Sequence, residues 1–241
     1  MRSTIHLLLI TVGIILSFTR CTRIEPVDPI DLKDQAFFQA LLELGIDTNG
    51  DGMISKTEAA SVRSLDVSGK GIYDISGIES FVNLRSLNCC CNYFTTLDLI
   101  HNTSLDTLRC FMSALTQLEV SENASLRYLD CSSCDLTSLD LTNTTALEYL
   151  NCFNCGLTSL DVSNQPVLER LLCGGNQLTA LDISNNTSLV PTVVLYDCYL
   201  GIENMPTLEQ VCVWTIPFPP DNLTVCADGS PNVYFTTGCS R

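Results

Sequence analysis

Apolar residues recur along the central part of this chain with a period of 21. A leucine opens each of five successive blocks, and a second leucine follows three residues later. The opening leucines are Leu84, Leu105, Leu126, Leu147 and Leu168. Self-similarity at a fixed period predicts stacked units that bury one continuous core between them. The pattern therefore predicts an elongated array of short repeats.

Two further positions recur in every block. Five residues after the opening leucine stands a cysteine: Cys89, Cys110, Cys131, Cys152 and Cys173. Eight residues after it stands an asparagine, a serine or a second cysteine: Asn92, Ser113, Cys134, Cys155 and Asn176. The second half of each block repeats as well, for example LTSLDL and LTSLDV.

The combined template, L-x-x-L-x-C-x-x-(N/C)-x-L, resembles the leucine-rich repeat with cysteine in place of the third leucine. The close match covers residues 84–188, with degenerate units at 64–83 and 189–214. The resemblance implies an α/β solenoid with 21-residue units. It also implies a parallel β-sheet on the concave face, a small helical N-terminal cap and an irregular C-terminal cap. This variant is similar to repeat proteins on the surface of Bacteroidetes-type bacteria.

The cysteine spacing allows three interpretations. Cys131, Cys134, Cys152 and Cys155 form C-x2-C-x17-C-x2-C, which is typical of a four-thiolate zinc site. Cys131 and Cys152 are 21 residues apart, as are Cys134 and Cys155, so each pair occupies one position of the repeat. This favours two columns of buried free thiols that behave as small hydrophobic side chains. Neighbouring parallel strands lie about 4.8 Å apart, so disulfides along a column are a third interpretation.

A second motif lies before the repeats. Residues 47–58 read DTNGDGMISKTE and match the EF-hand calcium loop. The oxygen ligands expected for Ca²⁺ come from Asp47, Asn49, Asp51, the Met53 carbonyl, Ser55 and Glu58. We expect a structural role, in which Ca²⁺ orders the N-terminal cap that shields the first repeat. The alternative is a turn that binds no metal.

The resemblance places the residues that flank the strand leucines on the concave face. Aromatic and arginine side chains gather there, and these residue types are enriched at protein interfaces. The predicted partner-binding residues are Arg109, Phe111, Met112, Tyr128, Tyr149, Phe153 and Arg170. Alternatively, the aromatic rings only cover the sheet.

The N-terminus predicts export. Arg2 precedes an apolar run at 5–18, and Cys21 follows almost at once. This resembles a bacterial lipoprotein signal with Cys21 as the lipidated residue, although Arg20 stands where that signal has a small residue. Ordinary cleavage near Thr19 and an uncleaved anchor are the alternatives. We therefore expect an outer-membrane or cell-surface lipoprotein or a secreted protein, with membrane contact only through a lipid anchor.

The remaining chain divides around the repeats. We expect a signal peptide at 1–21, a linker at 22–34, a helical cap with the calcium loop at 35–63, leucine-rich repeats at 64–211 and a C-terminal cap at 212–241. In an oxidising compartment, a Cys226–Cys239 disulfide is expected to close that last segment, in preference to a disulfide involving Cys212.

Charge and composition narrow the function. The net charge of −15 opposes nucleic-acid binding, which needs clustered basic residues. Only two histidines are present, and no nucleophile–histidine–acid set or phosphate loop is recognisable. The sequence predicts a non-enzymatic surface protein whose concave face binds a protein partner in adhesion or host contact. The alternative is a glycan-binding accessory protein that uses the aromatic column for stacking.

Overall fold

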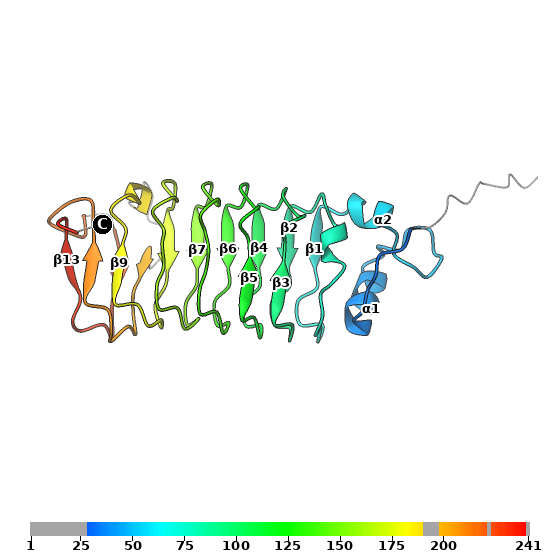
Figure 1. The fold of residues 1–241 in the computed structure, drawn as a ribbon, viewed down its shortest axis with the longest axis horizontal. Coiled ribbons are helices and arrows are strands. Elements are labelled where there is room, and N and C mark those ends of the chain that lie inside the picture. The colour runs from blue at the N-terminus through cyan, green and yellow to red at the C-terminus, as the bar shows by residue number, and fades with distance from the viewer. Residues whose placement is uncertain (1–27, 190–197, 221–222, 240–241) are drawn as a thin grey trace, which may run out of the picture.

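The computed structural model describes residues 28–189, 198–220 and 223–239. Two short helices, α1 (Gln35–Glu43) and α2 (Lys56–Ser61), precede a row of stacked coils (Figure 1). Each coil contributes one short strand to a parallel sheet, which confirms the predicted leucine-rich repeat solenoid. The predicted signal peptide and Cys21 lie outside the described residues.

The main sheet has eight parallel strands. In order they are β1 (Ser64–Asp66), β2 (Ser86–Asn88), β4 (Thr107–Arg109), β6 (Tyr128–Asp130), β7 (Tyr149–Asn151), β8 (Arg170–Leu172), β10 (Leu200–Gly201) and β12 (Val225–Cys226). The pairing is in register, so Leu108 faces Leu129 and Leu129 faces Leu150. The middle leucine of these strands is buried and its two neighbours point outward, as strand geometry requires. We call the surface made by the outward side chains the sheet face.

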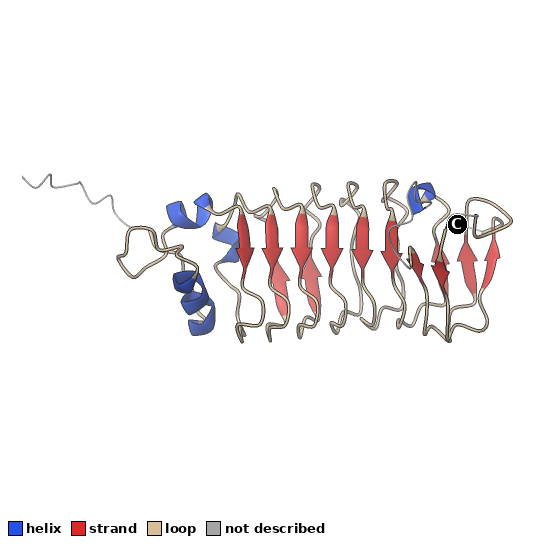
Figure 2. Cartoon of the chain, turned by 180° about the vertical axis from the view of Figure 1, so that it is seen from behind, coloured by secondary structure: helices blue, strands red, loops and turns tan. Residues whose placement is uncertain are grey.

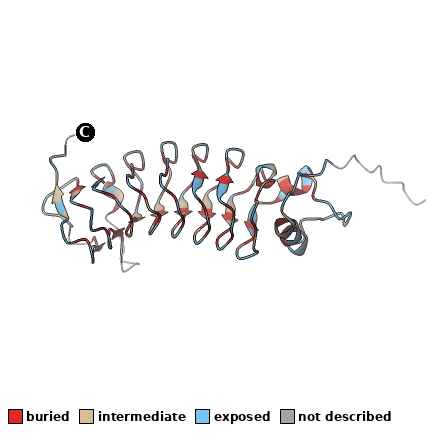
Figure 3. Cartoon of the chain, turned by 60° about the horizontal axis from the view of Figure 1, so that its bottom comes forward, coloured by how far each residue is buried: buried red, intermediate tan, exposed pale blue. Residues whose placement is uncertain are grey.

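The second half of several repeats also forms strands, which the sequence did not predict. They are β3 (Thr96–Asp98), β5 (Gln117–Glu119), β9 (Ala180–Asp182), β11 (Gln210–Cys212) and β13 (Tyr234–Thr236), in a two-stranded and a three-stranded parallel sheet. Within the described repeats the only helices are the single turns η1 (Ile78–Ser80) and η2 (Thr187–Leu189). Because both layers have the spacing of strands, the row of coils runs nearly straight, and the predicted concave face is only weakly curved (Figures 1, 2 and 3).

The cysteine column lies in the core. Cys89, Cys110, Cys131, Cys152 and Cys173 are fully buried and unpaired, which confirms the prediction of buried free thiols. Figure 3 shows buried residues recurring in coil after coil. The thiols of Cys110 and Cys131 donate to the carbonyl oxygens of Asp130 and Asn151, each at 3.6 Å. Burial raises the pKa of Cys173 to about 12, so this thiol stays protonated and unreactive at neutral pH.

At four of its five positions the second column donates to buried carbonyl groups of the turns. At the fifth, the buried hydroxyl of Ser113 has no hydrogen-bond partner among the described residues. The amide nitrogen of Asn176 donates to the carbonyl oxygens of Cys152 at 2.8 Å and Cys173 at 2.7 Å. One repeat earlier, the thiol of Cys155 donates to the carbonyl oxygen of Cys131 at 3.2 Å. The thiol thus replaces part of the asparagine's bonding, because it has one weak donor where the amide has two.

A third buried column lies in the turns between repeats. It consists of Asn102, Asn123, Thr144, Gln165 and Asn186, all at most 1% exposed. The amide of Asn123, for example, donates to the carbonyl oxygens of Leu99 and Asn102. The four amide side chains hold one turn to the turn before it, whereas the hydroxyl of Thr144 donates to the carbonyl oxygen of Leu141 in its own turn. Their role is therefore structural.

The N-terminal cap begins earlier than the sequence predicts. Pro29 forms an antiparallel bridge with Ser55, and the amide of Ile30 donates to the carbonyl oxygen of Ile54 at 2.8 Å. Ile30 is buried with the core, so from residue 28 the expected linker is part of the cap. Phe37 of α1 contacts Phe81 of the first coil, with ring centroids 6.5 Å apart. The cap therefore closes the first coil with apolar side chains.

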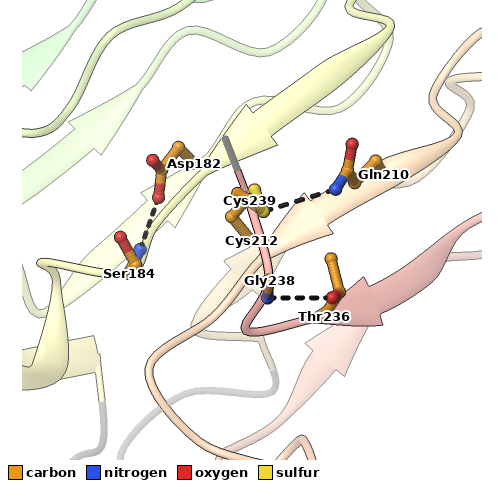
Figure 4. Close-up of a disulfide and its surroundings, with 7 residues drawn as sticks. All are labelled: Asp182, Ser184, Gln210, Cys212, Thr236, Gly238 and Cys239. Carbon is orange, nitrogen blue, oxygen red and sulfur yellow. Dashed lines mark hydrogen bonds between the residues drawn. A yellow bond between two sulfur atoms is a disulfide. The ribbon is translucent and has the colours of Figure 1, made fainter. Parts of the chain in front are cut away.

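The C-terminal segment continues the solenoid, and its disulfides differ from the prediction. Strands β12 and β13 extend the two layers, so the segment is less irregular than expected. Cys226 is paired with Cys198 and Cys239 with Cys212, in place of the expected Cys226–Cys239 disulfide. The Cα separations are 5.9 and 6.0 Å, and Figure 4 shows the second disulfide beside Gln210. Each disulfide joins residues one turn apart, because those are neighbours in space.

The polar column generates a stability prediction. Asn176→Cys removes two amide bonds to buried carbonyl groups and supplies one weaker donor. It also removes the Oδ1 acceptor of the backbone amides of Cys155 and Leu157. We expect the free energy of unfolding to fall by about 1–3 kcal/mol, as measured by urea denaturation. Asn164→Ser changes an exposed asparagine of the same region and should leave the midpoint nearly unchanged. Equal stability of Asn176→Cys and the wild type would contradict the role given to this column.

Candidate binding face

Four side chains form a continuous stack across the sheet face. The register places Tyr128 of β6 directly beside Tyr149 of β7, and Tyr149 beside Arg170 of β8. The two tyrosine rings are parallel, with centroids 4.3 Å apart and an interplanar angle of 1°. The guanidinium of Arg109 lies 4.5 Å from the centre of the Tyr128 ring, and that of Arg170 lies 5.4 Å from the Tyr149 ring. The order is therefore Arg109, Tyr128, Tyr149, Arg170.

This stack occupies both faces of both rings. Stacked aromatic pairs and cation–π contacts are each favourable by about 0.5–1.5 kcal/mol. Burial and the neighbouring Tyr128 raise the pKa of Tyr149 well above that of a free phenol. The row is thus a rigid, partly desolvated unit, and the parts of the tyrosines left for a ligand are their edges.

A shallow hollow of about 570 Å³ opens beside the stack. Charged side chains of both signs line it together with the tyrosines: Asp106, Arg127, Glu148, Glu169 and Arg170. Arg127 and Glu148 form an ion pair whose Nε–Oε1 distance is 2.9 Å. The hollow therefore has an aromatic wall and a charged rim.

The other predicted partner-binding residues lie on the same face or at its edge. Phe111 and Phe153 are half-buried, with Ser132 between them in the stacking order. Met112 is 61% exposed and has a left-handed φ of 51°. That conformation is uncommon for a long side chain, and here a turn that recurs in every coil imposes it. All seven predicted residues therefore lie within one region.

One neighbour of the stack was missed by the sequence analysis. Tyr199 is buried, precedes β10 and lies beside Arg170, because Leu200 pairs with Leu171. The spacing between those leucines is 29 residues in place of 21. The break in the period hid this position, and only the degenerate Tyr-Leu-Gly-Ile sequence at 199–202 signalled a strand.

The predicted calcium loop has much of the required backbone geometry. The Asp47 carboxylate accepts hydrogen bonds from the amides of Gly50, Asp51 and Gly52, and Gly52 has a left-handed φ of 78°. Ile54 is buried, and its carbonyl group bonds to Ile30. The extended segment around Ile30 thus pairs with the loop at Ile54. In a protein with two EF-hands, the second calcium loop would be expected at this place.

The Glu58 side chain is engaged in the fold. Its carboxylate accepts hydrogen bonds from the amide and hydroxyl groups of both Thr48 and Ser55, and with Ser55 it forms a capping box on α2. Burial opposes ionisation, but these bonds outweigh it and lower the pKa of Glu58 to about 2. Among the described residues, no three acidic, histidine or cysteine side chains converge on one point. Calcium binding by this loop therefore remains a prediction.

The fold and the face together define a leucine-rich repeat solenoid with a cysteine column and an aromatic–arginine stack. The functional domain of InlJ from Listeria monocytogenes, described as including a cysteine ladder, is similar over 86% of this chain and 64% of that one, with a TM-score of 0.56 and 23% identity. Internalin C2 from the same species is similar over 84% and 82%, with a TM-score of 0.56 and 16% identity.

A leucine-rich repeat protein of Leptospira interrogans is similar over 76% of this chain and 47% of that one, with a TM-score of 0.54 and 19% identity. At these identities the likeness establishes the fold. This chain spans less than two thirds of the InlJ domain and of the Leptospira protein. The sequence matches no protein-family profile and no curated protein. Within the described ranges, no helix is long and apolar enough to cross a membrane.

The stack predicts how its tyrosines titrate. Because the folded-state pKa of Tyr149 is raised, the stability it contributes is present below pH about 10 and is lost as the pH rises further. In an alkaline titration of phenolate absorbance, the difference between wild type and Tyr149→Phe should lie at the most alkaline end. If the phenol that Tyr149→Phe removes ionises near pH 10, the interpretation of Tyr149 as a partly desolvated member of the stack is wrong.

Proposed function

We propose that this chain is an exported, non-enzymatic surface protein that binds a protein partner through the sheet face. The observation that carries the proposal is the stack of Arg109, Tyr128, Tyr149 and Arg170 beside a charged hollow. Tyrosine and arginine are the residue types that dominate the binding energy of protein interfaces. The exposed Met112 and the half-buried Phe111 and Phe153 enlarge the apolar part of the same region.

The arrangement of the rings favours a protein over a glycan. A sugar that stacks on an aromatic side chain needs a free ring face. Both faces of Tyr128 and Tyr149 are covered, by each other and by the two arginines. A protein partner needs only edges, hydroxyl groups and charged ends, which remain accessible on a weakly curved face.

Export and surface attachment complete the proposal. The apolar leader and Cys21 support either a lipoprotein at the cell surface or a secreted protein, acting in adhesion or host contact. The two disulfides of the C-terminal region suit an oxidising compartment. The net charge of −15 supports a partner other than nucleic acid.

The sheet-face proposal is tested with a triple variant of the sheet face and a double variant that serves as its control. Replacing Tyr128, Tyr149 and Phe153 by serine should weaken partner binding at least tenfold, since the loss of a single hot-spot aromatic side chain costs about 2 kcal/mol or more and about 1.4 kcal/mol is a tenfold change. The control replaces Tyr73 and Tyr93, a second stacked pair whose ring centroids are 4.9 Å apart, by serine. Binding is measured by surface plasmon resonance against a partner captured from host or neighbouring-cell surfaces, with glycan arrays in parallel.

Melting temperatures of both variants separate binding from folding. The proposal fails if the sheet-face variant binds as tightly as the Tyr73/Tyr93 control. It also fails if a glycan, and no protein, is the ligand lost in that variant.

We further propose that Ca²⁺ binds residues 47–58 and stabilises the N-terminal cap. Asp47, Asn49, Asp51, the Met53 carbonyl, Ser55 and Glu58 would hold the ion, all as oxygen ligands suited to a hard cation. The Asp47 hydrogen bonds and the turn at Gly52 support this arrangement. The pairing of Ile54 with Ile30 connects the loop to the cap, and α1 contacts the first coil, so the ion would order the start of the solenoid.

Calcium addition should raise the melting temperature of the full chain. At a free concentration one hundredfold above Kd the expected stabilisation is about 2.7 kcal/mol. Asp47→Ala should abolish the increase, whereas Glu122→Gln, which removes an exposed acid far from the loop in the sequence, should retain it. Identical thermal curves of the wild type with calcium and with chelator would contradict the stabilising role.

A further inference from the structure

The few positive charges of the repeat region are concentrated at the sheet face. Residues 71–240 contain no lysine and four arginines, against 18 aspartates and glutamates. The arginines are Arg85, Arg109, Arg127 and Arg170. Arg109 and Arg170 lie within β4 and β8, and the other two immediately precede β2 and β6. Apart from Lys70 of the first coil, which forms an ion pair with Glu43 of α1, the cationic groups of this mainly acidic solenoid lie in or directly before strands of the main sheet.

Arg109 differs from its neighbours in how its guanidinium is used. It makes no hydrogen bond or ion pair with any of the described residues, and its one ring contact is with Tyr128. Asp130, its neighbour in the register, is engaged with the amide and hydroxyl groups of Ser132. Arg127, in contrast, is bonded to Glu148. Arg109 is thus a positioned cation whose hydrogen-bond donors have no acceptor within the described part of the chain.

Stacking prepares this group for one kind of ligand. The Cζ atom of Arg109 lies over the Tyr128 ring, and a guanidinium has five N–H donors that lie in its own plane. A planar fork held against a ring matches the two oxygens of a carboxylate and loses little conformational freedom on binding. Arg85 is exposed, makes no side-chain bond to the described residues, and adds a second positive charge on the same face.

We propose that Arg109 binds a carboxylate of the partner protein, from an aspartate or glutamate side chain, in a two-bonded arrangement. The inference rests on the sheet-face function proposed above and names the chemistry of the partner's contact. The net charge of −15 does not exclude an acidic segment, because charges farther away than about 8–10 Å are largely screened at physiological salt. Recognition is then local, through an arginine held over a ring, whose guanidinium donors have no hydrogen-bond acceptor among the described residues. The carboxylate of Asp66 is within electrostatic range of this guanidinium and offsets part of its positive charge without bonding to it.

The test uses a capped hexaglutamate peptide, a capped hexaglutamine peptide and an oligogalacturonate, with the full chain as receptor. We expect hexaglutamate to bind best, with an affinity that falls as salt rises. Arg109→Gln should reduce it on the order of tenfold or more, as expected for hydrogen bonds to a charged group. Arg109→Lys keeps the charge but loses the fork, and should give an intermediate loss.

Arg63→Gln is the control, because it removes the same charge from an exposed arginine directly before β1, two strands from β4, together with one long hydrogen bond to the carbonyl oxygen of Asn83. It should change the affinity less than twofold. The inference is overturned if hexaglutamate does not bind, if hexaglutamine binds equally well, if the acidic sugar is preferred, or if Arg63→Gln weakens binding as much as Arg109→Gln. If the tyrosine variants abolish partner binding while Arg109→Gln leaves it unchanged, the sheet-face function stands and this inference alone fails.

Discussion

Parallel stacking in register is the constraint on which the rest of this structure depends. With a period of 21, every residue lies beside its equivalents one coil before and one coil after it. A residue type that recurs at one position of the repeat therefore forms a column of neighbouring side chains along the molecule. Leucines and cysteines become continuous core columns, amides become hydrogen-bonded columns, and outward residues become rows on the sheet face. Stability and binding chemistry both follow from this one geometric rule.

The polar columns are as important to the fold as the leucines. Each turn of a coil leaves carbonyl groups in the interior without a backbone donor. A buried carbonyl group that lacks a donor costs about 1–3 kcal/mol of folding free energy. Asn92 and Asn176 satisfy these groups at two positions of the second column, with amide donors at 2.7–3.0 Å. Cys134 and Cys155 do so with longer thiol contacts of 3.4 and 3.2 Å. The chain therefore tolerates the weaker donor where neighbouring coils hold the turn in place.

Much of the fold could be predicted from the sequence, because residues 21 positions apart lie side by side in successive coils. The buried thiols and the pairing of Tyr128 with Tyr149 follow directly from the spacing of 21. The position of Arg109 over Tyr128 could not be predicted, since it is a diagonal contact that depends on rotamers. The disulfides were predicted wrongly, because Cys226 and Cys239 are near in sequence but lie in different layers. Their true partners, Cys198 and Cys212, are one irregular coil away, at separations of 28 and 27 residues.

The nearly straight axis affects what the sheet face can recognise. A strongly curved solenoid surrounds a ligand. On the weakly curved sheet face, the two parallel tyrosine rings present their edges to a ligand, with charged side chains beside them. The rings of Tyr128 and Tyr149 contribute rigidity, because each is held on both faces. Selectivity then comes from the groups that the stack positions and leaves available. In this chain the guanidinium of Arg109 fits that description, because the ring of Tyr128 holds it in place and none of the described residues accepts a hydrogen bond from it, although the carboxylates of Asp66 and Asp130 lie nearby.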